Sequence, residues 1–325
     1  MRVLVTGSSG LVGAALAGAL ERAGIGVTRF DCRDGDGAAD IRDPDRLAGA
    51  IAGCDGVFHL AAVSRVAWGE ATPGLCRTIN VAATRNVLSA AVQDRARPWL
   101  VFASSREVYG SLTEGPATEE TPFAPLNIYG ETKVAGEQDV VAAAEYGVRA
   151  AIVRLSNVYG GLNDHPDRAV PSLLWAAMQG KPLTISGAET FFDFVHVDDC
   201  VTGLIAAMNR LVTRKPGGPV HLVSGKATSL LELAEQARSV AGSASAIIVN
   251  PARPFDVPGF VGDPERAAEL LNWRADIGLR EGLERLFADL RRRGRPMDPV
   301  AMPPEQMTGR DYPAMRMARA AGGAH

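Results

Sequence analysis

The amino-acid sequence predicts an α/β fold, in which a doubly wound parallel sheet is followed by a smaller C-terminal α/β lobe. Two observations predict it. Short β-branched runs alternate with helical patterns through the first half of the 325 residues, which is typical of a parallel sheet with helices on both faces. After residue 160 this alternation loosens. We therefore expect a sheet domain over 1–160, a second lobe over 161–292 with some sheet crossover between them, and a tail over 293–325. The tail is either disordered or laid on the body or a partner.

Three glycines connect the first predicted strand, Val3 to Val5, to a helix that begins near Ala14. A strand that turns directly into a helix points main-chain N–H groups at one spot, where a pyrophosphate can bind. Gly7 permits the tight turn, Gly10 lets the backbone approach phosphates, and Gly13 lets the helix pack on the strand. An ordinary strand–helix turn is the alternative. The flanking strand and helix favour a dinucleotide site.

A carboxylate ends the second predicted strand. Asp31 lies 18 residues beyond Gly13, where an acid binds the adenosine ribose hydroxyls and repels a 2′-phosphate. This favours NAD over NADP, although Arg29 and Arg33 flank the acid and could soften the preference. A solvated loop aspartate is the competing interpretation.

Two later strands end in residues suited to a ligand site. The strand 56–62 ends in small residues, and its His59 is expected to be a packed, satisfied histidine. A helix over 75–92 follows, and the strand 98–103 delivers Ser104 and Ser105. Ligands bind at the carboxyl ends of parallel strands, so we expect the chemistry beside these hydroxyls. The loop 111–127 is long enough to form a flap over the site.

Tyr129 and Lys133 are four residues apart at the start of the next predicted helix and share one face. An ammonium there stabilises a phenolate, so we expect the pKa of Tyr129 to fall from about 10 towards neutrality. A general acid or base works best when it titrates near the operating pH. An isolated tyrosine–lysine pair would be an ordinary surface pair. Its position after the serine pair favours catalysis.

The remaining chain reads as shorter elements. Ser229 and Glu232 have the spacing of a capping box. The expected strands are 148–155, 183–185 and 220–223, and the expected helices are 170–179, 229–241, 266–271 and 279–290. Residues 191–199 precede a further helix that runs through Met208.

Composition excludes several classes of protein. The formal net charge of −3 argues against nucleic-acid or membrane-surface binding, where basic clusters are expected. The chain starts directly in a strand, and no apolar run is long enough to span a membrane. The four cysteines are scattered without a CxxC pair, and no histidine stands at metal spacing. We expect reduced thiols, no metal and a cytoplasmic location.

Taken in order, these motifs resemble the extended short-chain dehydrogenase/reductases, specifically the nucleotide-sugar epimerase/dehydratase group typified by UDP-galactose 4-epimerase. The resemblance covers about residues 1–290. It rests on Gly7, Gly10, Gly13, Asp31, Asp40, Ile41, His59 to Ala62, Asn80, Val81, Ser104, Ser105, Val108 to Gly110, Tyr129, Lys133, Arg154, Asn157 to Gly160, Asp193 to Val197, Asp199, Arg253, Pro254, Asp256 and Leu271 to Trp273.

The resemblance implies an NAD-dependent enzyme with a Rossmann sheet and a C-terminal lobe that binds a nucleotide sugar. Tyr129 would take the proton of the sugar C4 hydroxyl, Ser105 would hydrogen-bond that oxygen, and Lys133 would lower the tyrosine pKa and bind the nicotinamide ribose. Glu107 is a further catalytic candidate. The implied cofactor-binding residues are Gly7, Gly10, Leu11, Val12, Asp31, Asp40, Ile41, Leu60, Ala61, Ala62, Asn80, Tyr129 and Lys133. The implied substrate-binding residues are Ser64, Ser104, Asn157 and Arg253.

Two departures from the family pattern stand out. Arg106 and Glu107 replace the Asp-Glu pair of the usual 4,6-dehydratases, so the proton-donating aspartate is absent. Phe192 replaces an arginine that grips the substrate diphosphate. Losing such a charge-assisted contact costs about 1.5–3 kcal/mol. Arg253 matches the second diphosphate arginine, and either Arg168 or Lys181 would supply the missing cation, unless the substrate is not an ordinary nucleotide sugar.

The leading hypothesis is therefore an NAD-dependent epimerase acting at C4 through a transient 4-keto sugar. The alternatives are a dehydratase or decarboxylase that uses Glu107, an NAD-dependent dehydrogenase acting on a non-standard sugar, and a non-catalytic NAD-binding scaffold. Relatives pair the helices that carry Asn80 and Tyr129, so a homodimer is expected, although the apolar faces of these helices could equally be core.

Overall fold

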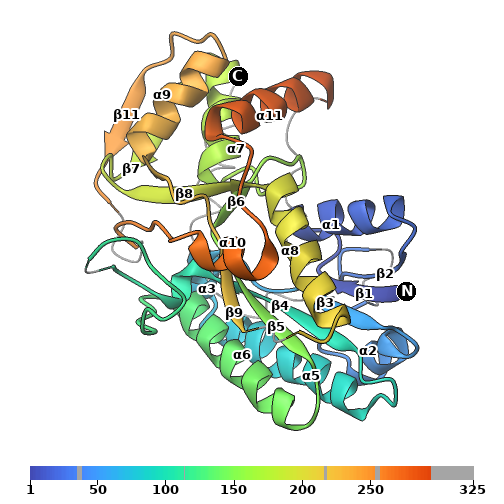
Figure 1. The fold of residues 1–325 in the computed structure, drawn as a ribbon. Helices are drawn as coiled ribbons and strands as arrows, with labels where there is room; N and C mark the ends of the chain where they lie inside the picture. The colour runs from blue at the N-terminus through green and yellow to red at the C-terminus, as the bar shows by residue number, and fades with distance from the viewer. Residues whose placement is uncertain (35–38, 113, 216–217, 253–256, 294–325) are drawn as a thin grey trace.

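The computed structural model describes residues 1–34, 39–112, 114–215, 218–252 and 257–293. The expected tail therefore lies outside the described residues apart from Arg293. A parallel six-stranded sheet forms the centre of the molecule (Figure 1). In spatial order its strands are β2 (Gly26–Phe30), β1 (Arg2–Thr6), β3 (Gly56–His59), β4 (Trp99–Ser105), β5 (Ala150–Leu155) and β9 (Pro219–Leu222). The predicted doubly wound sheet is confirmed.

Helices cover both faces of this sheet because successive strand residues point to opposite sides. Val3 and Val5 of β1 pack on one face, in a cluster with residues of α1 (Leu11–Arg22) and α8 (Val197–Val212). Leu4 points the other way and packs with α2 (Pro44–Ile51), α5 (Ala83–Gln93) and α6 (Ile128–Glu145). A strand buried on both faces reads as a continuous apolar run, which explains the Val-Leu-Val pattern.

Shorter elements form a second group beside the main sheet. The antiparallel pair β8 (Phe191–His196) and β10 (Ala227–Ser229) is extended by β6 (Asn157–Tyr159), which runs parallel to β8. Strands β7 (Leu183–Ser186) and β11 (Ile247–Asn250) make a parallel pair. Figure 1 shows this group with α7 (Ala169–Met178), α9 (Leu230–Val240) and α11 (Leu279–Arg293), whose apolar faces share one core cluster.

The chain crosses between the two groups in both directions. Strand β6 lies before residue 160 yet joins the second group, whereas α8 and β9 lie after it yet pack on and extend the main sheet. The division at residue 160 stays a prediction. The capping box at α9 is confirmed: Ser229 Oγ accepts from the Glu232 N–H, and the Glu232 carboxylate accepts from the Ser229 N–H.

The connection between β3 and β4 is more broken than the single expected helix. It contains α3 (Val66–Ala71), α4 (Pro73–Arg77) and a π-helical turn, η1 (Thr78–Ala82), before α5. A short 3₁₀ turn, η2 (Arg106–Val108), follows β4, and α10 (Glu265–Leu271) follows the second group of strands. A π-helical turn is rare and is frequently found at functional sites.

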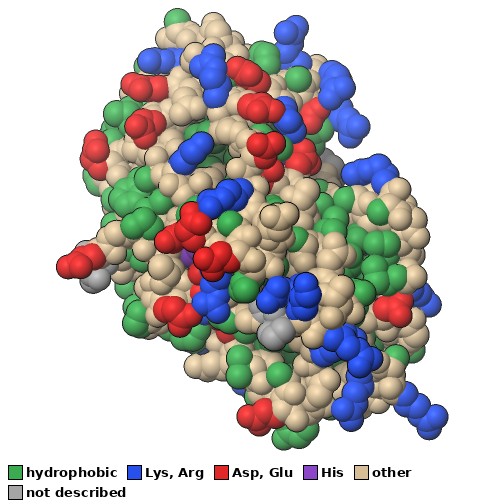
Figure 2. All heavy atoms as spheres, viewed as in Figure 1, with side chains coloured by type: hydrophobic (Ala, Val, Ile, Leu, Met, Phe, Trp, Pro, Cys, Tyr) green, Lys and Arg blue, Asp and Glu red, His purple; other side chains and the backbone are tan. Residues whose placement is uncertain are grey.

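The surface carries mixed charge. Figure 2 shows acidic and basic side chains interspersed over the viewed face. Within the described ranges, no helix is long and apolar enough to cross a bilayer. The cytoplasmic location stays a prediction.

Candidate active site

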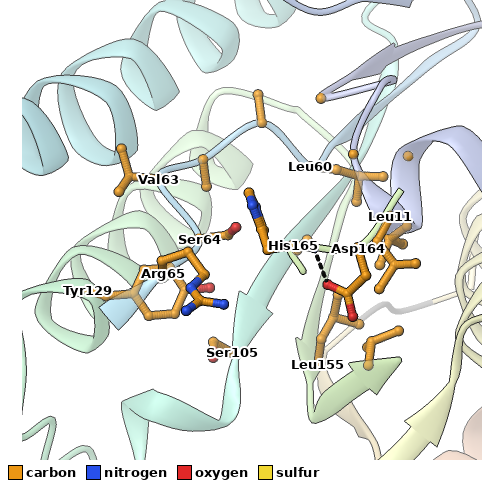
Figure 3. Close-up of a pocket in the computed structure, with 18 of the residues that line it drawn as sticks. Leu11, Leu60, Val63, Ser64, Arg65, Ser105, Tyr129, Leu155, Asp164 and His165 are labelled. Atoms are coloured by element: carbon orange, nitrogen blue, oxygen red, sulfur yellow. Dashed lines mark hydrogen bonds between the residues drawn. The ribbon is translucent and has the colours of Figure 1, made fainter. Parts of the chain in front are cut away.

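A pocket of about 440 Å³ opens at the carboxyl edge of the main sheet, where the sequence places the chemistry. Figure 3 shows Leu11, Leu60 and Leu155 on one side of it and Tyr129, Arg65 and Ser105 together on the other. One wall therefore comes from the glycine loop and the strand ends β3 and β5. The other comes from the residues expected to do chemistry.

The glycine loop adopts the close-packed turn that the sequence predicts. Gly7 has a positive φ of 72°, and a Cβ there would lie 2.7 Å from the Ala61 nitrogen. A Cβ on Gly13 would lie 2.0 Å from the Gly7 carbonyl oxygen, so any side chain would push α1 away from the loop. Helix α1 begins right behind this turn and directs its N-terminus at the pocket. These features fit the pyrophosphate of NAD.

Asp31 directly follows β2 and lines the pocket, as expected for a residue that binds the ribose hydroxyls. Its carboxylate forms an ion pair with Arg33. Arg33 Nε and Nη2 donate to the two carboxylate oxygens at 2.9 Å each, and the Ser9 N–H donates at 3.0 Å. Burial alone would raise the pKa of this carboxyl, but Arg33 and the two main-chain N–H groups hold it below its usual value. Asp31 is therefore ionised, and its direct partner is Arg33, one of the two arginines expected to soften the preference for NAD. Asp40 is paired with Arg42 in the same way.

Ser105, Tyr129 and Lys133 are brought to one side of the pocket from two elements. Ser105 ends β4, and its Oγ accepts from the Glu107 N–H at 3.2 Å. Tyr129 lies in the first turn of α6, which Asn127 caps by accepting from the Gly130 N–H at 2.8 Å. Lys133 follows one turn later, as the four-residue spacing predicts.

The expected fall in the tyrosine pKa is wrong for the structure as described. Burial raises the pKa of Tyr129 to about 12, against the lowering effects of the Ser105 hydroxyl and Arg168. Burial also lowers the pKa of Lys133 to about 8. The physical reason is that Lys133 Nζ donates to the Ala103 carbonyl oxygen at 2.8 Å and is itself poorly solvated. Lys133 Nζ lies 5.7 Å from the centroid of the Tyr129 ring, and burial outweighs the stabilisation that this charge gives the phenolate.

Asn80 does not line the pocket, contrary to its expected role as a cofactor contact. Its amide is buried and bridges two elements that do line it. Oδ1 accepts from the Val63 N–H at 2.8 Å, while Nδ2 donates to the Val63 oxygen at 3.1 Å and to Thr132 Oγ1 at 3.0 Å. Asn80 thus ties the segment after β3 to the helix turn that carries Lys133.

Ser104 lines the pocket, and its hydroxyl donates to Glu137 Oε1 at 2.5 Å. Arg154 binds the same carboxylate through Nε at 2.9 Å and Nη2 at 2.7 Å. Adjacent strand residues point to opposite faces, so only one serine of the pair can face the ligand. Because the Ser104 hydroxyl is engaged by Glu137, we expect Ser105 to be the serine that faces the ligand.

The substrate half of the pocket holds a side-chain cluster that the sequence did not single out as a binding group. Arg106 binds Asn157 through Nε at 2.6 Å and lies 2.7 Å from Glu107 Oε1. The other Glu107 oxygen accepts from Asn127 at 2.8 Å. The Arg106 guanidinium stacks over the Phe192 ring, 4.6 Å from its centroid. Arg106 was visible in the sequence only as a departure from the family pattern.

Other polar residues complete the lining. Ser64 and Arg168 line the pocket as expected, together with Arg65 and His165, which the sequence did not indicate. Lys181 is exposed just before β7 and is not a lining residue, so of the two proposed substitute cations only Arg168 is in place. Arg253 lies outside the described residues. The predicted site residues that do line the pocket are Gly7, Gly10, Leu11, Val12, Asp31, Asp40, Ile41, Leu60, Ala61, Ala62, Ser64, Ser104, Ser105, Glu107, Tyr129, Lys133 and Asn157.

His59 is a packed histidine, as expected. Its ring nitrogens lie 2.8 Å from Thr6 Oγ1 and 2.9 Å from Thr84 Oγ1, and burial lowers its pKa to about 3. All four cysteines are free thiols.

Comparison with known proteins agrees with this geometry. A family model described as the NAD dependent epimerase/dehydratase family matches residues 3–222. A UDP-glucose 4-epimerase of Streptomyces lividans is 31% identical over 314 residues, covering 86% of this chain and 93% of the relative. The solved structure of MoeE5 in complex with UDP-glucose and NAD is 30% identical with a TM-score of 0.81, covering 90% of this chain and 99% of that one.

A second solved structure is a UDP-glucuronic acid 4-epimerase from Bacillus cereus, in complex with UDP-glucuronic acid and NAD. It is 26% identical with a TM-score of 0.81, covering 90% of this chain and 99% of that one. The similarity therefore extends over nearly all of the described chain.

Proposed function

The chain belongs to the NAD-dependent epimerase/dehydratase family, and we propose that it inverts carbon 4 of a nucleotide-linked sugar through a transient 4-keto form. The observation that carries the proposal is the meeting of Ser105, Tyr129 and Lys133 in the pocket that the glycine loop also borders. Reversible oxidation of a sugar alcohol needs a base beside a dinucleotide site. Both the S. lividans relative and the B. cereus structure are named 4-epimerases.

Each residue has a defined part in this reaction. Tyr129 Oη takes the proton of the C4 hydroxyl and later returns it. Ser105 Oγ hydrogen-bonds the same oxygen and stabilises the phenolate, consistent with its lowering effect on the Tyr129 pKa. Lys133 lies one helical turn from Tyr129 and adds positive charge. Gly7, Gly10 and Asp31 line the part of the pocket that would hold NAD, and the cofactor would supply reversible hydride transfer there.

Glu107 as the base of an elimination or decarboxylation is less well supported. Its Oε1 is paired with Arg106 and its Oε2 accepts from Asn127. Both contacts stabilise the carboxylate as an anion, which makes it a weaker base. We infer that Glu107 positions Arg106.

The proposal is tested by incubating the NAD-loaded enzyme in D₂O with UDP-, GDP-, CDP- and dTDP-sugars, followed by NMR and mass spectrometry. An epimerase converts at least one sugar to its C4 epimer with unchanged mass, because the hydride stays within the site. A 6-deoxy-4-keto or pentose product would replace the proposal with dehydration or decarboxylation. Accumulation of NADH would replace it with a dehydrogenase.

We also propose that the enzyme is a homodimer through α5 and α6, as the resemblance implies. Helix α6 supports this because it leaves Val141 exposed. Light scattering after gel filtration should give the mass of two chains. The mass of one chain would contradict the pairing.

A further inference from the structure

Arg106 is a buried cation that lines the pocket, and its Nη1 nitrogen makes no hydrogen bond within the described residues. The residue is 8% exposed and lines the pocket together with Ser105 and Tyr129. Its Nε and Nη2 are engaged by Asn157 and Glu107. Its Nη1 is buried and has no hydrogen-bond partner within the described part of the chain. A buried N–H without an acceptor is costly, so an acceptor that arrives with a ligand would be bound favourably.

The Arg106 guanidinium is held by contacts with Asn157, Glu107 and Phe192. Asn157 comes from β6, Glu107 from η2, and Phe192 from β8, and the three hold the group from different elements. Glu107 is itself fixed by Asn127. Stacking on the Phe192 ring occupies one flat face of the guanidinium and leaves its N–H edge free for hydrogen bonding. The donor is therefore pre-organised.

This arrangement also accounts for the departure at position 192. The resemblance expects an arginine there, on β8, facing the substrate diphosphate. The structure instead puts an arginine from η2 over the ring of Phe192. A positive charge is thus kept near position 192, although it comes from another strand end. Among the pocket's other cations, Arg65 and Arg168 are paired with Asp167 and Asp164.

We propose that Arg106 is the receptor for an oxyanion of the substrate and that it selects which nucleotide sugars bind. This rests on the proposed function, because nucleotide sugars bring the required chemistry: phosphate oxygens always, and a carboxylate when the sugar is a uronic acid. A guanidinium N–H to a phosphate or carboxylate oxygen is a charge-assisted hydrogen bond, which is the strongest kind available to this donor.

The test measures binding, so it does not depend on turnover. NAD-loaded wild type, Arg106→Met and Arg106→Lys are titrated by calorimetry with UDP, UDP-glucose and UDP-glucuronic acid. We expect Arg106→Met to weaken binding about 10- to 100-fold, with Arg106→Lys in between, because an ammonium cannot keep both side contacts and the free donor. Weakening of all three ligands identifies the diphosphate as the anion. Weakening of UDP-glucuronic acid alone identifies the carboxylate.

Two further variants guard against a trivial result. Arg106→Met leaves Glu107 without its cation, so Arg106→Met/Glu107→Gln removes the buried pair together. Arg274→Met removes an arginine that pairs with the exposed Glu265 outside the pocket, and it should bind all three ligands as wild type does. Thermal unfolding and NAD content confirm that each variant is folded.

The outcomes separate this proposal from the proposed function. Binding by Arg106→Met within about twofold of wild type for every ligand overturns it, as does a wild type that binds none of them. If wild type binds the ligands and Arg106→Met does not, while no sugar is epimerised, the oxyanion receptor stands and the 4-epimerase proposal fails.

Discussion

Lys133 donates from Nζ to the main-chain oxygen of Ala103 at 2.8 Å, which holds the ammonium at the end of β4 with its nitrogen 5.7 Å from the centroid of the Tyr129 ring. The side chain is 4% exposed. A buried ammonium with such limited solvation is costly to the folded state, and its lowered pKa of about 8 expresses that cost. If Lys133 has the role proposed above, its burial exchanges stability for activity.

Replacing Lys133 with Met should therefore raise stability while removing activity. Below pH 8 the wild-type ammonium is charged in both states, and the fold bears the full cost of burying it. As pH rises from 8 to 10.5 the unfolded chain holds more protons, so wild-type stability recovers. Denaturant unfolding should show Lys133→Met more stable by about 1–3 kcal/mol at pH 7, with the gap closing by pH 10.5. A variant less stable at every pH would show that the ammonium contact stabilises the fold.

Replacing Tyr129 with Phe should slow turnover strongly and leave binding intact. The phenol oxygen is the only atom removed, so kcat should fall about 10²- to 10⁴-fold while NAD and nucleotide-sugar affinities stay within about twofold. Kinetics and calorimetry measure the two effects. Tyr146→Phe is the matched control, because Tyr146 is 66% exposed near the end of the same helix and should show wild-type kinetics. Full activity in Tyr129→Phe would show that Tyr129 is not the base.

The adjacent serines should differ in their effect on kcat. Ser105→Ala should lower kcat, because Ser105 Oγ hydrogen-bonds the reacting oxygen in the proposed mechanism, and it should also lose about 0.5–2 kcal/mol of stability, because the Glu107 N–H loses its acceptor. Ser104→Ala should keep kcat and lose about 1–2 kcal/mol of stability, because it removes a buried donor to Glu137. Each variant is the control for the other. If Ser104→Ala raised KM and left stability unchanged, the result would support the sequence prediction that Ser104 contacts the substrate.

Local patterns made the cofactor half predictable. The turn at Gly7, the contact at Gly13 and the helical spacing of Tyr129 and Lys133 each depend on residues close in sequence. The functions of Asn80 and Ser104 depend instead on partners 52 and 33 residues away, Thr132 and Glu137, which no local pattern reveals. The predicted fall in the Tyr129 pKa was wrong for the same reason, because the burial that raises this pKa depends on the packed fold.

The part of the pocket around Phe192 was harder to predict. In the sequence, Phe192 stands where the family pattern has an arginine, and Arg106 stands where it has an aspartate, but nothing in the sequence shows that these two side chains touch. Their contact requires η2 and β8 to meet across the pocket. That meeting depends on how the second group of strands packs beside the main sheet.

His59 should make the protein acid-sensitive. Its pKa is about 3 when folded and 6.5 when free, so between these values the unfolded chain binds the extra proton. Stability is therefore full above pH 6.5 and falls as pH drops towards 3. Between pH 6.5 and pH 3, the unfolding free energy of His59→Gln should fall by up to about 4 kcal/mol less than that of the wild type, as measured by urea unfolding at each pH. Parallel curves for the two proteins would show that His59 does not contribute.

Asn80 offers the clearest test of a positioning residue. Asn80→Asp keeps the shape and the acceptor oxygen but removes the donors to Val63 and Thr132, leaving a buried carboxylate near their oxygens. We expect a loss of about 1–3 kcal/mol in unfolding free energy.

A purely structural loss would leave NAD affinity unchanged once the variant is folded. A positioning role predicts more, because Asn80 joins a pocket-lining segment to the turn before Lys133. Calorimetry well below the melting temperature should then show NAD binding several-fold weaker and kcat lowered. Asn209→Asp, on an exposed position of α8, should change neither. If Asn80→Asp bound NAD as tightly as wild type, the amide bridge would be a stabilising contact without influence on the site.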